Sequence, residues 1–362
     1  MRLSLLALFF SLSALAQIYT GNGGHGPCTQ ATIVNGGEYN CTTLTINASP
    51  IFTPTATSLI IRVQGSVTIN APLDLNGANG LTIAFSGLPN DGGLGGPGAG
   101  NGGGDDGGGG QNDGSDMSDA SGKAGGGNAT CAHGGGGGGF SMIGYPGGNC
   151  GSPGGTPGQG GSVVPSSEFN LNTIFRGGFG GGAGNIISGD YGAGGGGGGA
   201  IHILAGGDIT ISTNMGATGR ISASGGNGGD GGADGSGGGA GSGGVIWLQT
   251  LGNINLQGSI EAIGGTGGDA GNIVSADGGN GGIGLIRLED ADGIITGGGS
   301  ITPNATVVPL IPIARNFESS ISCGSIRPSH ENQMSNFMQM FAGFMLIVGT
   351  SFLFKQSSKL FS

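Results

Sequence analysis

Three side chains of different chemistry occupy equivalent places in an internal repeat of this sequence: His202, Trp247 and Arg287. Each stands between two aliphatic residues of a short alternating segment, so we expect the three side chains on one outer face. An exposed indole ring beside imidazole and guanidinium groups is suited to stacking on a sugar ring. The alternative is that neighbouring segments cover this face and that Trp247, the only tryptophan, packs beneath them. The sequence therefore offers these residues as a candidate ligand-binding face.

Two aspartates end similar glycine-rich runs, GGNGGD at 225–230 and GGTGGD at 264–269. The carboxylates of Asp230 and Asp269 are ligands that a hard cation such as Ca²⁺ prefers. The runs resemble the first six places of the calcium-binding RTX nonapeptide, but glycine stands where that repeat has a large apolar residue. Calcium is the one cofactor that the sequence suggests, and solvated turn carboxylates are the alternative. An acidic insert offers further oxygen ligands at Asp105, Asp106, Asp113, Asp116 and Asp119.

Signals for catalysis are weak throughout the sequence. The four histidines are spread along the chain, and no HExxH or GxSxG motif is present. Glycine-rich matches to nucleotide-binding motifs arise by chance in such a chain, because none opens a helix after a strand. The aligned positions Asp208, Asn253 and Gly293 offer one carboxylate, whereas glycoside chemistry uses paired carboxylates. We therefore expect no catalytic residues and no enzyme, with a polysaccharide-active protein as the alternative.

The repeat that carries these residues predicts short strands. Two copies are AIHILAGGDITI at 200–211 and VIWLQTLGNINL at 245–256, and a weaker third copy runs from LIRL at 285–288 to GIIT at 293–296. Each copy continues into a second strand whose isoleucine follows the first anchor isoleucine by eight residues, and then into a third strand. A single copy cannot bury its own apolar face, so we expect the copies to stack as a solenoid about 4.8 Å apart. The expected internal columns are Ile201, Ile246 and Ile286; Ile209, Ile254 and Ile294; and Ile221, Ile260 and Ile301.

This pattern resembles right-handed parallel β-helices of the pectin-lyase-like kind over roughly 57–85 and 200–305. The resemblance implies an all-β fold in which the segment 59–75 supplies an earlier turn. A β-sandwich of short strands is the alternative, although a period of 40 to 45 residues fits it poorly.

Glycine dominates the composition, with 93 glycines among 362 residues against roughly 7 % in average usage. The glycines are clustered without a strict three-residue period, which excludes collagen. The default for such runs is flexible loop, and the alternative is a bundle of polyproline-II-like glycine helices. The composition resembles that of glycine-rich phage tail adhesins and antifreeze proteins, which use such bundles. We expect ordered inserts that leave the solenoid on one side and pack together.

The ends of the chain predict export and anchoring. Residues 1–16 have the pattern of a secretory signal peptide, and the apolar stretch 337–354 is long enough for a single transmembrane helix. The lysines of the tail 355–362 predict that this end is cytoplasmic. The C-terminal region resembles the GlyGly-CTERM and MYXO-CTERM sorting signals, and a plain membrane anchor is the alternative. Between the ends we expect a β region at 17–86, a glycine-rich insert at 87–199, β-helix repeats at 200–305, and a strand with linker at 306–336.

The cysteines add constraints to this organisation. In an exported chain, proximity in sequence favours the disulfides Cys28–Cys41 and Cys131–Cys150. Cys323 is then left over, and it belongs to the expected sorting or anchor segment.

The amino-acid composition and the two ends of the chain together predict a class of function. The formal net charge of −11, with ten Lys and Arg, argues against nucleic acid as a partner. We expect a non-catalytic, exported cell-surface protein for adhesion or surface recognition, whose partner is a surface glycan or envelope component. The alternatives are a polysaccharide-binding β-helix protein and a purely structural envelope component.

Overall fold

The computed structural model describes residues 20–52, 57–83, 92–103, 133–149, 157–164, 176–184, 190–214, 217–233, 235–271 and 276–310. All of them belong to one compact unit, Met1–Ala314. Among them, no helix is long and apolar enough to cross a membrane. The predicted signal peptide 1–16, the predicted transmembrane helix 337–354 and its tail 355–362 lie outside the described residues. So do Cys131, Cys150, Cys323 and the acidic insert at Asp105, Asp106, Asp113, Asp116 and Asp119.

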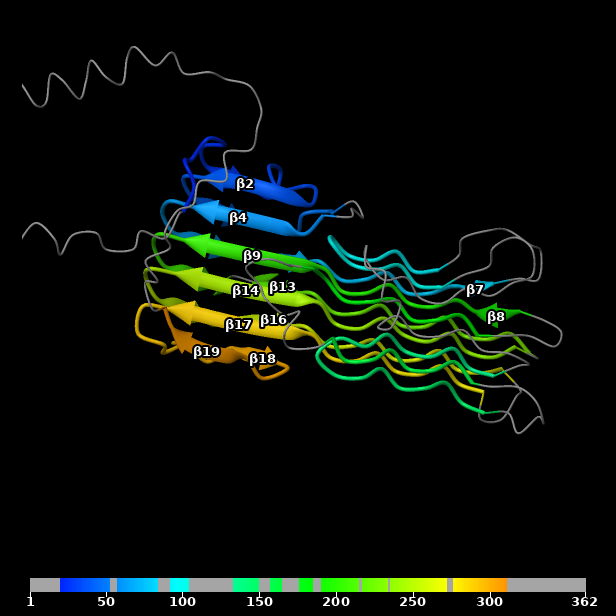
Figure 1. The fold of residues 1–362 in the computed structure, drawn as a ribbon. Helices are drawn as coiled ribbons and strands as arrows, with labels where there is room; N and C mark the ends of the chain where they lie inside the picture. Colours follow the sequence, from blue (N-terminus) through cyan, green and yellow to red (C-terminus); the bar gives the residue numbers. More distant parts are fainter. Residues whose placement is uncertain are drawn as a thin grey trace, which may run out of the picture. The chain divides into compact units, whose positions relative to one another are not determined.

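The described residues form an all-β fold in which the main sheets are parallel (Figure 1). The six-stranded sheet contains β2 (Gly37–Cys41), β4 (Leu59–Val63), β9 (Ala200–Ala205), β14 (Val245–Thr250), β17 (Leu285–Asp290) and β19 (Thr306–Pro309). The five-stranded sheet contains β1 (Cys28–Thr29), β3 (Leu44–Ile46), β5 (Val67–Ile69), β10 (Ile209–Ile211) and β15 (Ile254–Leu256). The four-stranded sheet contains β6 (Pro72–Asp74), β13 (Arg220–Ser222), β16 (Ser259–Glu261) and β18 (Ser300–Thr302). Two short antiparallel pairs complete the described strands: β7 (Thr82–Ile83) with β8 (Tyr191–Gly192), and β11 (Thr213–Asn214) with β12 (Ala217–Thr218).

The chain visits the three parallel sheets in turn, so that each visit forms one coil of a solenoid. The strands β4, β5 and β6 form one coil, β9, β10 and β13 the next, and β14, β15 and β16 the one after. Each strand pairs with its equivalent in the neighbouring coil. The parallel solenoid predicted from the repeat is therefore confirmed, and the earlier turn at 59–75 pairs with it as expected.

Stacked aliphatic side chains form the core between the sheets. Ile201, Ile246 and Ile286 occupy paired positions on β9, β14 and β17, and all three are buried. The columns Ile209–Ile254 and Ile221–Ile260–Ile301 are in register in the same way. In the short strands β5, β10 and β15 two buried residues flank a half-buried one, which is the alternation expected of a strand with one face on the core.

One predicted core position is wrong by a single residue. Ile294 is 61 % exposed, and the adjacent Ile295 packs against the core instead. The isolated pairing of Asn255 with Thr296 shows that this coil contains one extra residue relative to the previous one. The side chain of the buried Asp290 explains the shift, because it accepts the N–H of Gly293 at 2.7 Å and closes a tight turn before the strand position.

A disulfide closes the N-terminal coil. Cys28 in β1 and Cys41 in β2 are bonded, with their Cα atoms 5.6 Å apart, as the sequence predicted. Both cysteines and the nearby Ile33 are buried in the same cluster as the solenoid core. The disulfide therefore ties the first two strands over the end of the core.

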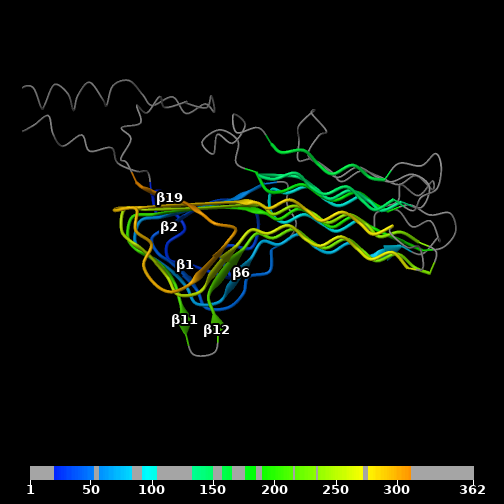
Figure 2. The same ribbon diagram turned by 90° about the horizontal axis from the view of Figure 1, so that it is seen from below.

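The glycine-rich segments lie side by side and extend from one corner of the solenoid (Figures 1 and 2). After each of β6, β13 and β16 the chain runs outward along this direction, and it returns before β9, β14 and β17. This confirms that the inserts leave on one side and pack together. We call their described parts the glycine bundle: 76–82, 92–103, 133–149, 157–164, 176–184, 190–199, 223–233, 235–244, 262–271 and 276–284.

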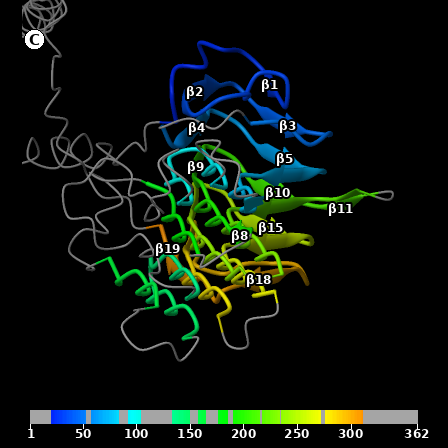
Figure 3. The same ribbon diagram turned by 90° about the vertical axis from the view of Figure 1, so that its right-hand side faces the viewer.

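Backbone hydrogen bonds hold the glycine bundle together with a period of three residues. Within 193–199, every third N–H points to the same neighbouring segment, which is the periodicity of a polyproline-II-type helix. The absence of side chains lets the segments approach, since a Cβ atom at Gly194 would overlap the carbonyl oxygen of Gly181. Figure 3 views the packed segments from the far end of the bundle. The donor–acceptor pairs are Ala193–Leu81, Gly196–Ala78 and Gly199–Leu75; Gly194–Gly103 and Gly197–Gly100; and Gly195–Gly239 and Gly198–Ser242.

Candidate functional site

The predicted face of His202, Trp247 and Arg287 forms as a ladder across the six-stranded sheet. Trp247 on β14 pairs with His202 on β9 and with Arg287 on β17. The imidazole and indole rings are stacked, with centroids 4.1 Å apart and planes 6° apart. The Cζ atom of Arg287 lies 5.6 Å from the indole centroid. The structure therefore brings all three predicted residues together.

The indole ring of this ladder is buried. Trp247 is only 3 % exposed, because it belongs to an apolar cluster that includes Phe140, Val164 and Phe179 from the glycine bundle. The expectation of an exposed indole is wrong, and the inserts cover this part of the sheet. These apolar residues anchor the bundle on the outer face of the solenoid.

The polar groups around Trp247 are paired with one another. The carboxylate of Glu289 accepts hydrogen bonds from Trp247 Nε1 at 3.2 Å and from Gln249 Nε2 at 2.6 Å. Arg287 forms an ion pair with the same carboxylate. His202 Nε2 lies 2.7 Å from Gln249 Oε1. A network that satisfies its own groups supports the docking of the bundle rather than a ligand.

A second surface, on the glycine bundle, keeps its polar groups at the outside. On three neighbouring segments every third residue is polar and points away from the packed glycines, while the glycines between them are buried or half-buried. We call this surface the polar face. It consists of Asn76, Asn79, Thr82, Ser224, Asn227, Asp230, Thr266 and Asp269.

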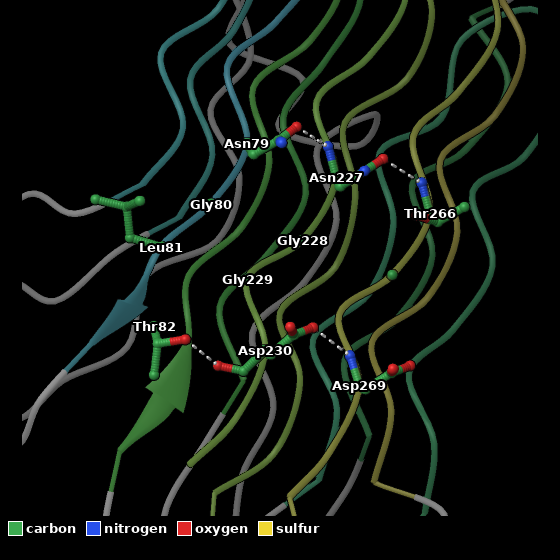
Figure 4. Close-up of a pocket in the computed structure, with 11 residues that line it drawn as sticks. Asn79, Gly80, Leu81, Thr82, Asn227, Gly228, Gly229, Asp230, Thr266 and Asp269 are labelled. Atoms are coloured by element: carbon green, nitrogen blue, oxygen red, sulfur yellow. Dashed lines mark hydrogen bonds between the residues drawn. The ribbon is translucent and has the colours of Figure 1, made fainter.

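Each of several side chains on the polar face uses one atom to bind the next segment (Figure 4). The Oδ1 atom of Asn79 accepts the N–H of Asn227 at 2.9 Å, and Oδ1 of Asn227 accepts that of Thr266 at 3.0 Å. The Oδ1 atom of Asp230 accepts the N–H of Asp269 at 2.9 Å. Among the described residues, the second polar atoms of Asn79, Asn227 and Asp230 have no hydrogen-bond partner. These amide donors and this carboxylate acceptor are held in place and face outward.

The polar face contains a shallow open pocket of about 500 Å³. Backbone of Gly80, Gly228, Gly229 and Gly267 contributes to its lining, so side chains do not fill it. Leu81, which is 62 % exposed, adds an apolar patch. The remaining lining residues are Asn79, Thr82, Asn227, Asp230, Thr266 and Asp269.

The aspartates that the sequence offered to calcium lie on this face. Asp230 and Asp269 stand at equivalent places of adjacent segments, as their matching runs suggested. Asp277 on the following segment accepts the N–H of Ala270 at 2.9 Å. Within the described ranges, no three His, Cys, Asp or Glu residues are grouped as a metal site would require. Calcium binding at these two aspartates stays a prediction.

Sequence reasoning missed the amide row of the polar face, Asn79 and Asn227, and the neighbouring Thr266, whose backbone N–H donates to the Asn227 amide. A signal was available, because Asn227 and Asp230 are three residues apart in a glycine run, as are Thr266 and Asp269. That spacing places them on one side of a helix with three residues per turn.

Comparison of the chain with protein-family models, with curated proteins and with solved structures finds no match.

Proposed function

We propose that this chain is a non-catalytic, exported cell-surface protein for adhesion or surface recognition. The glycine bundle is the part that meets the partner, and the solenoid supports it. The observation that carries this proposal is the polar face, where fixed amide and carboxylate groups surround an open pocket on a backbone-bonded bundle. Rigid, preorganised surfaces lose less entropy when they bind.

The finer features of the fold belong to the same proposal. We propose that the coils wind right-handed, as in pectin-lyase-like β-helices, because connections between parallel strands are right-handed in almost all proteins. The period-three hydrogen bonds support a bundle of the polyglycine-II type.

Export and anchoring rest on the sequence at the two ends. We propose that 1–16 is removed as a signal peptide and that 337–354 holds the protein in the envelope unless it is processed near Cys323. The partner is a surface glycan or another envelope component. Mass spectrometry of the mature C-terminus tests the anchor, since a retained 337–362 identifies a membrane anchor and truncation near Cys323 identifies sorting.

Adhesion is tested with beads that carry the full chain. We expect wild-type beads to adhere to a cell or polysaccharide surface and Gly237→Val beads to lose adhesion, because a side chain at Gly237 overlaps the Gly268 carbonyl inside the bundle. Gly298→Val is the matched control, since Gly298 has open space around its Cβ position. Equal adhesion of the two variants would place recognition outside the bundle, and turnover of a polyuronate would overturn the non-catalytic assignment.

A further inference from the structure

We propose that the pocket of the polar face binds a neutral, extended oligosaccharide laid along the glycine segments. This inference rests on the proposed function, because it names the class of ligand for the surface already described. The ligand contacts the amide row, Asn79 and Asn227, and the carboxylate row, Asp230 and Asp269, at the same time.

The outward atoms of the pocket match the hydroxyl groups of a sugar. Asn79 and Asn227 each have their Oδ1 atom bonded to the neighbouring segment, which leaves Nδ2 as an outward donor. Asp230 has Oδ1 bonded in the same way, which leaves Oδ2 as an outward acceptor. A sugar hydroxyl accepts from the first kind of group and donates to the second. The segment-to-segment bonds fix these atoms before the ligand arrives, so that little side-chain entropy is lost.

The spacing between the two polar rows favours an extended ligand. Asn227 and Asp230 are three residues apart on one segment, which corresponds to about 9.3 Å at roughly 3.1 Å per residue. This separation exceeds the width of one sugar ring, so a ligand that reaches both rows has at least two rings. The pocket is open rather than enclosed, and it continues over the glycines between the two rows (Figure 4). An extended chain fits this shape better than a compact ligand.

The charge of the pocket and its apolar part favour an uncharged ligand. The chain has a formal net charge of −11, and Asp230 and Asp269 lie in the pocket itself. Like charges therefore disfavour a polyuronate or a phosphorylated glycan. Leu81 offers an exposed apolar side chain beside the polar rows, which suits the C–H face of a sugar. The favoured ligand is uncharged, with free hydroxyl groups.

The test uses substitutions that change the outward Nδ2 or Oδ2 atom and keep the Oδ1 atom that accepts the hydrogen bond from the neighbouring segment. Asn227→Asp retains Oδ1 and replaces the Nδ2 donor by an acceptor, and Asp230→Asn makes the opposite change. Asn76→Asp is the matched control, because Asn76 accepts the N–H of Ser224 on the same face but does not line the pocket. The full chain and the three variants are titrated with hexasaccharides of β-glucan, mannan and chitin, with polygalacturonate, and with CaCl₂ alone. Thermal unfolding is measured for each variant.

We expect wild type to bind at least one neutral hexasaccharide, with binding at least tenfold weaker in N227D and in D230N and unchanged in N76D. Melting temperatures should agree among the four proteins. Absence of binding to every neutral hexasaccharide overturns the inference, as does stronger binding of polygalacturonate. Binding of CaCl₂ alone that is lost in D230N, without saccharide binding, would identify a cation site instead. If beads that carry N227D or D230N still adhere, the proposed adhesion is supported, and only the assignment of this ligand is wrong.

Discussion

The indole ring of Trp247 lies flat on the imidazole ring of His202, with centroids 4.1 Å apart and 6° between the planes. The two residues come from neighbouring coils, β14 and β9, and Trp247 belongs to an apolar cluster with Phe140 and Phe179. It therefore connects two coils of the solenoid and the glycine bundle at one place. Trp247, which the sequence suggested as a residue for stacking on a sugar, instead packs the glycine bundle against the solenoid.

Trp247→Ala should destabilise the protein without changing saccharide binding. Removal of a buried aromatic side chain of this size costs about 3–5 kcal/mol, and it also leaves the Glu289 carboxylate without one of its donors. Urea unfolding measures the loss, and the hexasaccharide titration measures binding. Trp247→Phe serves as the conservative control and should recover part of the stability. If the Trp247→Ala protein folds but no longer binds saccharide, the saccharide site lies at His202, Trp247 and Arg287 rather than on the polar face.

Gly237→Ala should destabilise the bundle although it adds a single methyl group. The new Cβ atom would overlap the carbonyl oxygen of Gly268, so that two segments must separate. Overpacking of this kind costs about 1–3 kcal/mol. Gly298→Ala, where the Cβ position is open, should change the unfolding free energy by less than about 0.5 kcal/mol. Equal effects of the two substitutions in urea unfolding would contradict the close packing.

The one-residue shift in the last coil gives a pair of neighbouring substitutions with different outcomes. Ile294→Ser should have little effect, because Ile294 is exposed. Ile295→Ser should destabilise by roughly 1–3 kcal/mol, because it places a hydroxyl group against the core that Ile295 now packs on. Thermal unfolding of both variants checks the register. The reverse order of stabilities would restore the unshifted alignment of Ile294 with Ile254.

Loss of the Cys28–Cys41 disulfide should destabilise the N-terminal coil. The bond closes a loop with a sequence separation of 13, and a loop of about this length corresponds to roughly 3 kcal/mol. The double variant Cys28→Ser with Cys41→Ser should show this loss in urea unfolding. Limited proteolysis should then cut first near β1, and an unchanged digestion pattern would show that the coil holds without the bond.

The sequence predicted the solenoid well because its signal is local and repeated. Ile201, Ile246 and Ile286 stand in alternating strands at similar spacing, and burial on one face fixes their register. The shift at Ile294 escaped prediction because the eight-residue spacing from Ile286 to Ile294 matches the other two copies, whereas the turn that moves the register is closed by the buried Asp290 side chain. The disulfide followed from proximity in sequence.

The candidate site was harder to predict than the fold. The burial of Trp247 depends on Phe140, Val164 and Phe179, which are far away in sequence and lie in runs without apolar periodicity. The polar face depends on which glycine segments become neighbours, since Asn79 and Asn227 are separated by 148 residues. The three-residue spacing within one glycine segment indicates which of its side chains lie on the same side. It does not indicate which glycine segments become neighbours in the bundle.

The alternation of outgoing and returning segments has a mechanical consequence for the proposed adhesion. Every described segment that runs out from β6, β13 or β16 is paired through its backbone to neighbours that are fixed in other coils. A pull along the bundle loads these hydrogen bonds in shear, all at the same time, rather than opening them one after another. The glycines that remove side-chain bulk therefore give the bundle many weak bonds that share the load, and a contact made at its surface is transmitted to several coils at once.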